Sequence, residues 1–302
     1  MNIILVGGTG AIGRKIAQVL DKKGYKYYSF TRNIENSINV LPNAIGHIKF
    51  ADNNINEQLN AVEKSDAIIN LAGASIAGGL WTEKYKQEIY NSRIETTNKL
   101  AELLNKFPND EKVFVSTSAI GIYGNQGDTI LTEDSVAANT FLAKVCVDWE
   151  EASRKVNENI RVVNPRVGIV LDTKTGALPK LVLPFKFFAG GPIGTGRQWY
   201  SWIHIQDLAN LYVKFIEAPN FKGVYNAVAP NPVIMNEFAK FIGKQLHRPS
   251  IFKVPEFAIK LILGESAEMV LASQRVSSKK LLDANFEFQF PELDLALKDL
   301  LN

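Results

Sequence analysis

A glycine-rich turn directly after a short apolar run is the feature that most constrains how this chain can fold. The run Ile-Ile-Leu-Val at residues 3–6 stops at Gly7, and Gly10 and Gly13 follow before a helical pattern of apolar residues that starts at Ile12. Glycine lets the backbone bend sharply after a strand and come close to a ligand. The free N–H groups and the positive end of the helix attract an anion. The segment therefore predicts a strand, turn and helix that hold the pyrophosphate of a dinucleotide.

The glycines of this turn fit two related patterns. Gly8, Gly10 and Gly13 match G-x-G-x-x-G, and Gly7 shifts the match to G-x-x-G-x-x-G. We prefer the second pattern because Gly7 follows the strand immediately, and a tight turn without a ligand is the alternative interpretation. The residues expected to contact the pyrophosphate are Gly7, Thr9, Gly10, Ala11, Ile12 and Gly13.

The end of the next expected strand, Tyr25 to Arg32, indicates which dinucleotide is bound. NAD-binding proteins commonly carry an acidic residue here for the ribose 2′-hydroxyl, whereas a cation suits a 2′-phosphate. This chain has Thr31 and Arg32, and a guanidinium can hold a phosphate with two parallel hydrogen bonds. We therefore expect NADP(H) rather than NAD(H). A solvated surface arginine is the alternative interpretation of Arg32.

Strand and helix patterns alternate through the first half of the chain, which predicts an α/β fold with a doubly wound parallel sheet. Further strands are expected at residues 47–50, 67–71, 112–116 and 161–164, with helices at about 55–63, 82–107 and 141–156. From about Val167 onward glycine and proline turns loosen the pattern, although helices are expected at about 236–246 and 256–263. We expect a Rossmann domain at residues 1–166 and a smaller substrate-covering lobe at residues 167–302, which could exchange elements with the first domain.

The informative loops all follow expected strands, so they fall on one edge of a parallel sheet, where such folds bind ligands. We expect Asp52 to meet the adenine edge and residues 71–73 to run along the adenosine and ribose. The further cofactor contacts expected at this edge are Thr31, Arg32, Asp52, Leu71, Ala72, Gly73 and Ser116.

Composition excludes several other classes of protein. The 302 residues carry a formal charge of only +3, without a dense basic run, so no nucleic-acid partner is expected. Cys146 is the only cysteine, and His47, His204 and His247 show no ligand spacing, so we expect no disulfide and no metal. No apolar stretch approaches the ~20 residues that cross a bilayer, and the first core strand begins at the start of the sequence. The cytoplasm is the expected location.

Several short motifs together resemble one family. They are Asn70-Leu71-Ala72-Gly73, Trp81-Thr82, Ser92-Arg93, Ser116-Thr117-Ser118-Ala119, Tyr123-Gly124, Trp149-Glu150 and residues 226–232, Asn-Ala-Val-Ala-Pro-Asn-Pro. The chain resembles the extended short-chain dehydrogenases/reductases, the NAD(P)-dependent epimerases and dehydratases. More narrowly it is similar to an atypical "epimerase family protein" group, including that group's uncharacterised C-terminal region.

The resemblance implies a serine after the fifth strand and a Tyr-x-x-x-Lys pair on the next helix, where the tyrosine transfers a proton and the lysine lowers its pKa. Ser118 takes the serine place, either as a catalytic residue or as a loop serine. The pair is missing: aligning on Glu150 puts Leu142 and Cys146 in its positions. Thr140 and Lys144 keep the spacing, but an alcohol is far harder to ionise than a phenol, and we regard this match as a coincidence.

A proton donor must then come from elsewhere if the protein is a catalyst. Tyr123, close after Ser118, is the first candidate, with a structural aromatic as the alternative. We expect Arg166, Arg197 and His204 near the substrate, although each could instead hold protein groups together. Cys146 lies in an apolar helical stripe and is assigned to packing.

These observations favour an NADP(H)-binding oxidoreductase or epimerase-like enzyme on a small polar substrate, with a sugar nucleotide implied only by the resemblance. The alternative is a catalytically silent protein that senses NADPH or acts as a scaffold, since the tyrosine and lysine are absent. The sequence does not indicate an oligomeric state.

Overall fold

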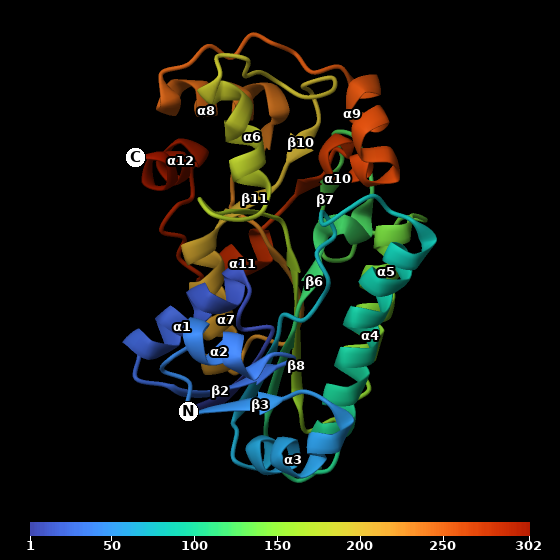
Figure 1. The fold of residues 1–302 in the computed structure, drawn as a ribbon, viewed down its shortest axis with the longest axis vertical. Coiled ribbons are helices and arrows are strands. Elements are labelled where there is room, and N and C mark those ends of the chain that lie inside the picture. Colours follow the sequence, from blue (N-terminus) through green and yellow to red (C-terminus); the bar gives the residue numbers. More distant parts are fainter.

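A parallel β-sheet forms the centre of the lower part of the molecule in the computed structural model, which describes residues 1–302 (Figure 1). Every pairing within this sheet is parallel. The strand order is β3 (Gly46–Lys49), β2 (Lys26–Thr31), β1 (Asn2–Val6), β4 (Ala67–Asn70), β5 (Val113–Ser116), β8 (Arg161–Val167) and β12 (Gly223–Ala227), with the short β6 (Ser118–Ala119) also paired to β8. The predicted doubly wound α/β fold is confirmed.

Helices cover both faces of this sheet because its central strands are apolar on both sides. The face on the left of Figure 1 carries α1 (Ala11–Lys22) and α7 (Ile205–Glu217), which pack on each other. The opposite face carries α3 (Ile55–Glu63), α4 (Glu83–Leu104) and α5 (Phe141–Ser153). The short α2 (Ile34–Val40) and the 3-10 helix η1 (Asp52–Asn54) lie next to β3 in the chain.

A second lobe, at the top of Figure 1, has its own hydrophobic core. Phe185, Tyr200, Trp202, Phe238 and Leu297 are all buried there. Its helices are α6 (Ala177–Lys186), α8 (Met235–Leu246) and α12 (Leu293–Leu301), and its strands are β9 (Ile169–Leu171), β10 (Trp199–Tyr200), β11 (Trp202–His204) and β13 (Val233–Ile234).

Short elements near the boundary of the two lobes come from distant parts of the chain. They are η2 (Ile120–Tyr123), β7 (Ile130–Leu131), α9 (Glu256–Leu263), η3 (Gly264–Ala267), α10 (Glu268–Leu271), β14 (Arg275–Val276) and α11 (Lys279–Asp283). β14 pairs with β7, so the C-terminal region is joined to the loop that follows η2. No helix of the structure is long and apolar enough to cross a membrane.

The chain crosses between the lobes more than once. After the predicted boundary at residue 166, α7 and β12 return to the main sheet, and buried residues of α7 share a core with α1. Residues 205–227 therefore belong in space with the first domain. The sequence allowed for an exchange of elements between the domains but did not show which elements take part, because β12 and its partner β8 lie far apart in the chain.

Candidate functional site

The turn between β1 and α1 has the tight geometry that the glycines predict. Gly7 has a φ of 76°, a conformation that side-chain-bearing residues rarely adopt, and its carbonyl accepts a hydrogen bond of 3.1 Å from the N–H of Gly10. A Cβ on Gly13 would lie 2.5 Å from Cα of Gly8, so this glycine lets the helix pack directly on the turn. The conformation of Gly7 agrees with the pattern that starts at this residue.

Gly10 differs from its neighbours because it faces open space. A Cβ there would meet only the carbonyl oxygen of Gly7, at 3.4 Å. Gly10 is also the N-cap of α1, no side chain caps this helix end, and no acidic residue stands in the first turn. The first N–H groups of α1 are therefore available to an anion, with the positive end of the helix behind them. Thr9, Ala11 and Ile12 surround this position and are partly exposed.

Two predicted cofactor residues, Arg32 after β2 and Asp52 after β3, lie at the surface. Arg32 is exposed and its side chain makes no hydrogen bond or ion pair, while the Thr31 hydroxyl binds the backbone of Asn33. The carboxylate of Asp52 accepts a hydrogen bond of 2.6 Å from Lys99, and this contact lowers the pKa of Asp52. Arg32 thus keeps all its donors free, whereas Asp52 already has a partner.

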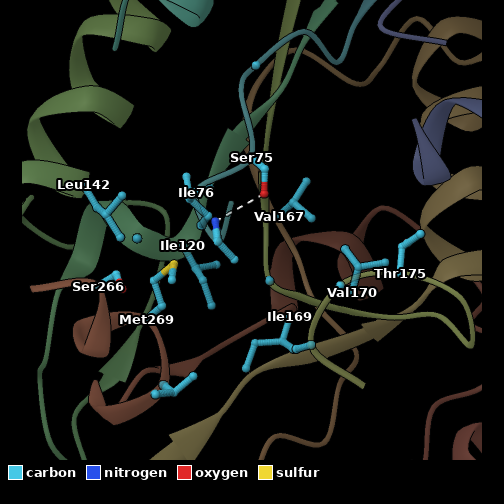
Figure 2. A pocket seen from close by; sticks show the side chains of 18 of the residues that line it. Ser75, Ile76, Ile120, Leu142, Val167, Ile169, Val170, Thr175, Ser266 and Met269 are labelled. Atoms are coloured by element: carbon cyan, nitrogen blue, oxygen red, sulfur yellow. Dashed lines mark hydrogen bonds between the residues drawn. The ribbon is translucent and has the colours of Figure 1, made fainter. Parts of the chain in front are cut away.

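A cavity of about 1160 Å³ begins at this turn and runs between the lobes. Gly7, Gly10, Ala11, Ile12 and Gly13 line one end of it. The rest is lined by the loop at residues 73–80, by α5, by β9 and by α9 and α10 of the C-terminal region. Of its 47 lining residues 27 are hydrophobic; Figure 2 shows Ile120, Leu142, Ile169, Val170 and Met269 around the space.

The strand ends beside the turn contribute unequally to the cavity. Leu71 and Gly73 line it, but Ala72 does not, and its N–H donates to Asn70 Oδ1. Ser116 is fully buried and does not line the cavity; its hydroxyl oxygen accepts a hydrogen bond of 3.3 Å from Asn70.

Cys146, on α5, lines the cavity. Burial raises the pKa of its thiol to about 11, so the thiol stays protonated at neutral pH.

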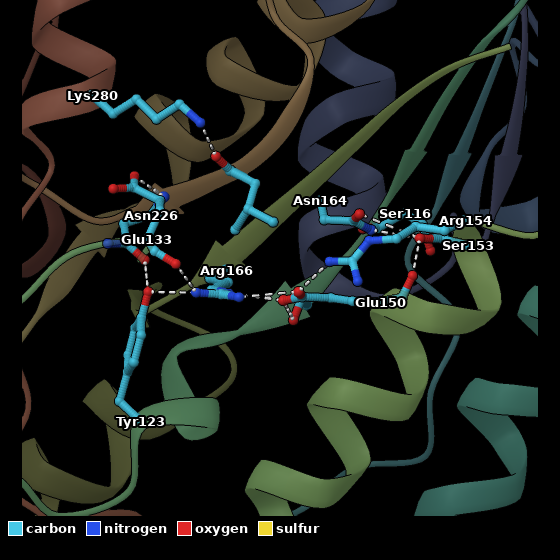
Figure 3. A network of polar contacts seen from close by, with 12 residues as sticks. Ser116, Tyr123, Glu133, Glu150, Ser153, Arg154, Asn164, Arg166, Asn226 and Lys280 are labelled. Atoms are coloured by element: carbon cyan, nitrogen blue, oxygen red, sulfur yellow. Dashed lines mark hydrogen bonds and ion pairs between the residues drawn. The ribbon is translucent and has the colours of Figure 1, made fainter. Parts of the chain in front are cut away.

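The predicted catalytic residues Ser118 and Tyr123 belong to one buried polar network. Figure 3 shows the part of it around Tyr123, Arg166 and Glu150. The Ser118 hydroxyl donates to Glu150 across 2.8 Å, and the Arg166 guanidinium donates to both oxygens of Glu150 at 2.8 and 3.1 Å. The Tyr123 hydroxyl donates to Asn226 and accepts from Arg166 at 2.9 Å. Arg166 therefore connects the Tyr123 hydroxyl, directly, with the Ser118 hydroxyl, through Glu150. The two N–H groups with which it could hold a substrate anion are already bonded to Glu150.

Tyr123 lies away from the cavity. Its ring is fully buried and absent from the lining, and burial raises the pKa of its phenol to about 12. Ser118 does line the cavity, although its proton is directed toward Glu150. Both hydroxyl protons are therefore donated to acceptors within the protein.

The other two predicted substrate residues also lie outside the cavity. Arg197 is exposed and its side chain makes no hydrogen bond. His204 is the N-cap of α7, where Nδ1 accepts the N–H of Gln206, and its ring stacks on Phe290 with centroids 3.9 Å apart. Its Nε2 lies 3.3 Å from Asp299 without forming a hydrogen bond, and burial lowers its pKa to about 4. His204 is thus a neutral helix cap.

Sequence reasoning assigned no role to Arg93, which lines the cavity. It lies on the inward stripe of α4, one turn from each of the buried residues Ile89 and Thr97. A charged residue in an otherwise buried stripe is a signal that the sequence offered. The sequence also gave no sign that Ile259, Ile262 and Met269, from the C-terminal region, complete the cavity.

Comparison with known proteins places these features in a family context. Residues 3–228 match the NAD dependent epimerase/dehydratase family, and residues 254–300 match a domain of unknown function, DUF1731. The chain is 38% identical over its whole length to the epimerase family protein SDR39U1 homolog, chloroplastic, of Arabidopsis thaliana, of which it covers 87%. It is also 38% identical to the epimerase family protein YfhF of Bacillus subtilis, covering 100% of this chain and 98% of that protein.

Solved structures include a similar protein with a bound ligand. The crystal structure of human epimerase family protein SDR39U1 (isoform 2) with NADPH superimposes with a TM-score of 0.89 at 32% sequence identity, over 99% of both chains. A nucleoside-diphosphate sugar epimerase from Corynebacterium glutamicum superimposes with a TM-score of 0.77 at 28% identity, over 100% of this chain and 58% of that one.

Proposed function

Because the chain belongs to the NAD-dependent epimerase/dehydratase family, and within it to the epimerase family proteins that end in DUF1731, we propose that it binds NADP(H) and catalyses hydride transfer with a small molecule. The resemblance noted in the sequence is thereby confirmed at the level of the family. The human relative was crystallised with NADPH, which supports the same cofactor here.

One observation carries the proposal: a glycine turn with open N–H donors leads directly into a large cavity. Gly10 and the first N–H groups of α1 would hold the pyrophosphate, since a Cβ at Gly10 would face the space that a phosphate needs. Arg32, exposed and free of partners, would hold the 2′-phosphate. Leu71 and Gly73 would run beside the ribose.

When bound, NADPH supplies the hydride. Ser118 would stand at the cavity wall with its lone pairs available, while Glu150 fixes its proton. The thiol of Cys146 adds no base, because burial raises its pKa to about 11. Hydride transfer to a carbonyl leaves an alkoxide that must gain a proton, and this proton would come from solvent water in the cavity, because the hydroxyl protons of Ser118 and Tyr123 are donated within the protein. The residues of this chain would therefore bind and orient the reactants.

The cavity lining changes the expected substrate. We expected a small polar molecule. Beyond the glycine turn at residues 7–13, here called the cradle, most of the side chains that line the cavity are apolar. A sugar nucleotide carries a second diphosphate, and the cavity wall beyond the cradle has only Arg93 and Lys180 as cations. A compact carbonyl compound with an apolar body fits this lining better.

An NADPH sensor without turnover is the second candidate. It is favoured by the hydroxyl protons of Ser118 and Tyr123, which are both donated inside the protein. In this role the protein would report the cofactor to a partner, and its partners and oligomeric state are open predictions. The cytoplasm remains the predicted location.

Two measurements test the proposal. Titration of the purified chain with NADPH should show saturable binding with enhanced nucleotide fluorescence, and the same titration with NADH should be weaker. Single-turnover reactions with 4-deuterated NADPH and a panel of aldehydes, ketones and nucleotide sugars should give a deuterated product. Tight NADPH binding with no label transferred to any carbonyl would support the sensor, and no binding at millimolar NADPH would refute both.

A further inference from the structure

Arg93 enters the cavity through a specific local arrangement. Its side chain folds back along α4, where Nη1 donates to the carbonyl of Ile89 across 2.9 Å. One face of the guanidinium lies over the Trp149 ring, with Cζ 5.1 Å from its centroid. On another side it packs against Gly73, where an added Cβ would come within 2.8 Å of Cζ. The missing side chain at Gly73 is what makes room for this cation.

The loop after β4 is held against the same turn of α4. The hydroxyl of Ser92 accepts a hydrogen bond of 2.9 Å from the N–H of Ala74. The hydroxyl of Tyr85 donates to the carbonyl of Ser75, and the indole of Trp81 donates to Ile76. These contacts fix the loop wall beside the guanidinium, so Arg93 stands in a formed pocket.

Arg93 has no anionic partner. No carboxylate lies within ion-pair distance of it, and Ile89 is the only acceptor of its five N–H groups. Burial lowers the pKa of Arg93, whereas the pair with Glu150 outweighs burial and raises the pKa of Arg166. A half-buried cation that faces neutral neighbours is costly unless an anion completes it. Arg93 thus has donors and charge that the protein itself does not use.

The phosphates of the cofactor have donors elsewhere in the proposed arrangement. The pyrophosphate faces the N-terminus of α1, and the 2′-phosphate faces Arg32 at the end of β2. The aromatic ring under Arg93, Trp149, belongs to α5. The two carboxylates that line the cavity, Asp172 and Glu268, form no ion pair with Arg93. The position of Arg93 therefore suits a second ligand beside the cofactor.

We propose that Arg93 binds a carboxylate or phosphate group of the substrate, which is thus a small molecule with one anionic head and an apolar body. This inference rests on the proposed function, since it concerns the remainder of the same cavity. The guanidinium holds the head with two parallel hydrogen bonds, and the apolar wall of Leu142, Ile169 and Met269 receives the body.

Simple aromatic probes test this assignment with the NADPH-loaded protein. Benzoate and phenyl phosphate carry the two anionic heads, and benzamide is the neutral control of the same size. Binding is measured by calorimetry and by the tryptophan emission, because Trp149 contacts Arg93. At least one anion should bind the native protein about tenfold or more tightly than benzamide. Arg93→Gln should abolish this preference, and Arg93→Lys should keep part of it.

The matched control is Arg154→Gln on α5, an exposed arginine that already pairs with Glu150. It should bind the probes as the native protein does. Arg93→Gln should melt at the native temperature or above, because it removes an unpaired half-buried charge. It should also keep its NADPH affinity within about threefold, since the cofactor phosphates have other donors.

Three results would overturn the proposal. The first is equal binding of the anions and benzamide by the native protein. The second is a preference for anions that Arg93→Gln retains. The third is a loss of NADPH affinity of about tenfold or more in Arg93→Gln, which would assign Arg93 to cofactor binding. Failure of the native protein to bind NADPH would refute the proposed function instead. In that case the affinities for benzoate, phenyl phosphate and benzamide can still be measured with the protein that holds no cofactor.

Discussion

Arg166 and Glu150 form a two-pronged ion pair inside the protein, with Nε–Oε1 and Nη2–Oε2 distances of 2.8 and 3.1 Å (Figure 3). The pair joins β8 to α5, and it aligns Ser118 on one side and Tyr123 on the other. Removing one partner of a buried pair leaves the other charge uncompensated. This relationship assigns Arg166 to the structure of the site instead of to substrate binding.

The first prediction concerns the stability that this pair provides. Arg166→Met should lower the free energy of unfolding by ~3–5 kcal/mol, because the Glu150 carboxylate loses its main partner. Arg154→Gln, which breaks the exposed contact with the same carboxylate, should cost less than about 1 kcal/mol. Urea unfolding measures both, and equal effects of the two variants would contradict a structural role of the buried pair.

Tyr123→Phe should separate stability from chemistry. Removing the hydroxyl leaves Asn226 Oδ1 and one Arg166 N–H without their bonds, at a cost of ~1–3 kcal/mol. Hydride transfer at saturating substrate should stay within a few-fold, because the phenol does not reach the cavity. Urea unfolding and single-turnover rates provide the two readings. Loss of transfer in a fully folded variant would restore Tyr123 as a proton donor.

Two glycines of the turn should respond differently to alanine. Gly10→Ala should fold normally, since the new Cβ meets only one atom at 3.4 Å, but it should weaken NADPH binding about tenfold or more by occupying the phosphate space. Gly13→Ala, by contrast, should lower the free energy of unfolding by ~2–3 kcal/mol, because its Cβ collides with the backbone of Gly8. Calorimetric titration and thermal unfolding distinguish them. Native NADPH affinity in Gly10→Ala would remove the basis for the cradle.

Arg32→Asp should weaken NADPH binding much more than NADH binding. Loss of a charged hydrogen bond to the 2′-phosphate should weaken NADPH by ~1.5–3 kcal/mol and leave NADH nearly unchanged. Arg197→Asp makes the same charge change at an exposed position outside the cavity, and it should alter neither affinity. Fluorescence titrations with both nucleotides check this, and equal weakening of both by Arg32→Asp would reject the assigned role.

The buried neutral His204 should make stability depend on pH. Burial lowers its pKa from 6.5 to about 4, so between these values the unfolded chain binds a proton that the folded chain excludes. Stability is thus complete above pH 6.5 and should fall by ~2–3 kcal/mol as pH drops toward the folded pKa. His204→Asn keeps a helix-capping acceptor and should lack this part of the loss. Urea unfolding of both proteins near neutral and acidic pH provides the comparison.

Local sequence patterns predicted the conformation of the glycine turn well. The β1–turn–α1 unit depends on residues that are neighbours in the chain, and Gly7, Gly10 and Gly13 carry their own conformational signal. The alternating strands and helices likewise follow from apolar spacing, so the order of β1 to β5 could be expected. The roles of Ser118, Tyr123 and Arg166 could not, because their partners Glu150 and Asn226 lie far away in sequence.

The sequence by itself determined a parallel α/β fold and a glycine cradle open to an anion, since both depend on backbone conformation and short-range periodicity. Only the tertiary structure decided which polar groups are already paired. It neutralises Arg166 with Glu150 and leaves Arg93 unpaired at the cavity wall, although both are arginines on buried positions of regular elements. The physical reason is that charge compensation depends on distances between segments, and those distances exist only once the lobes have packed.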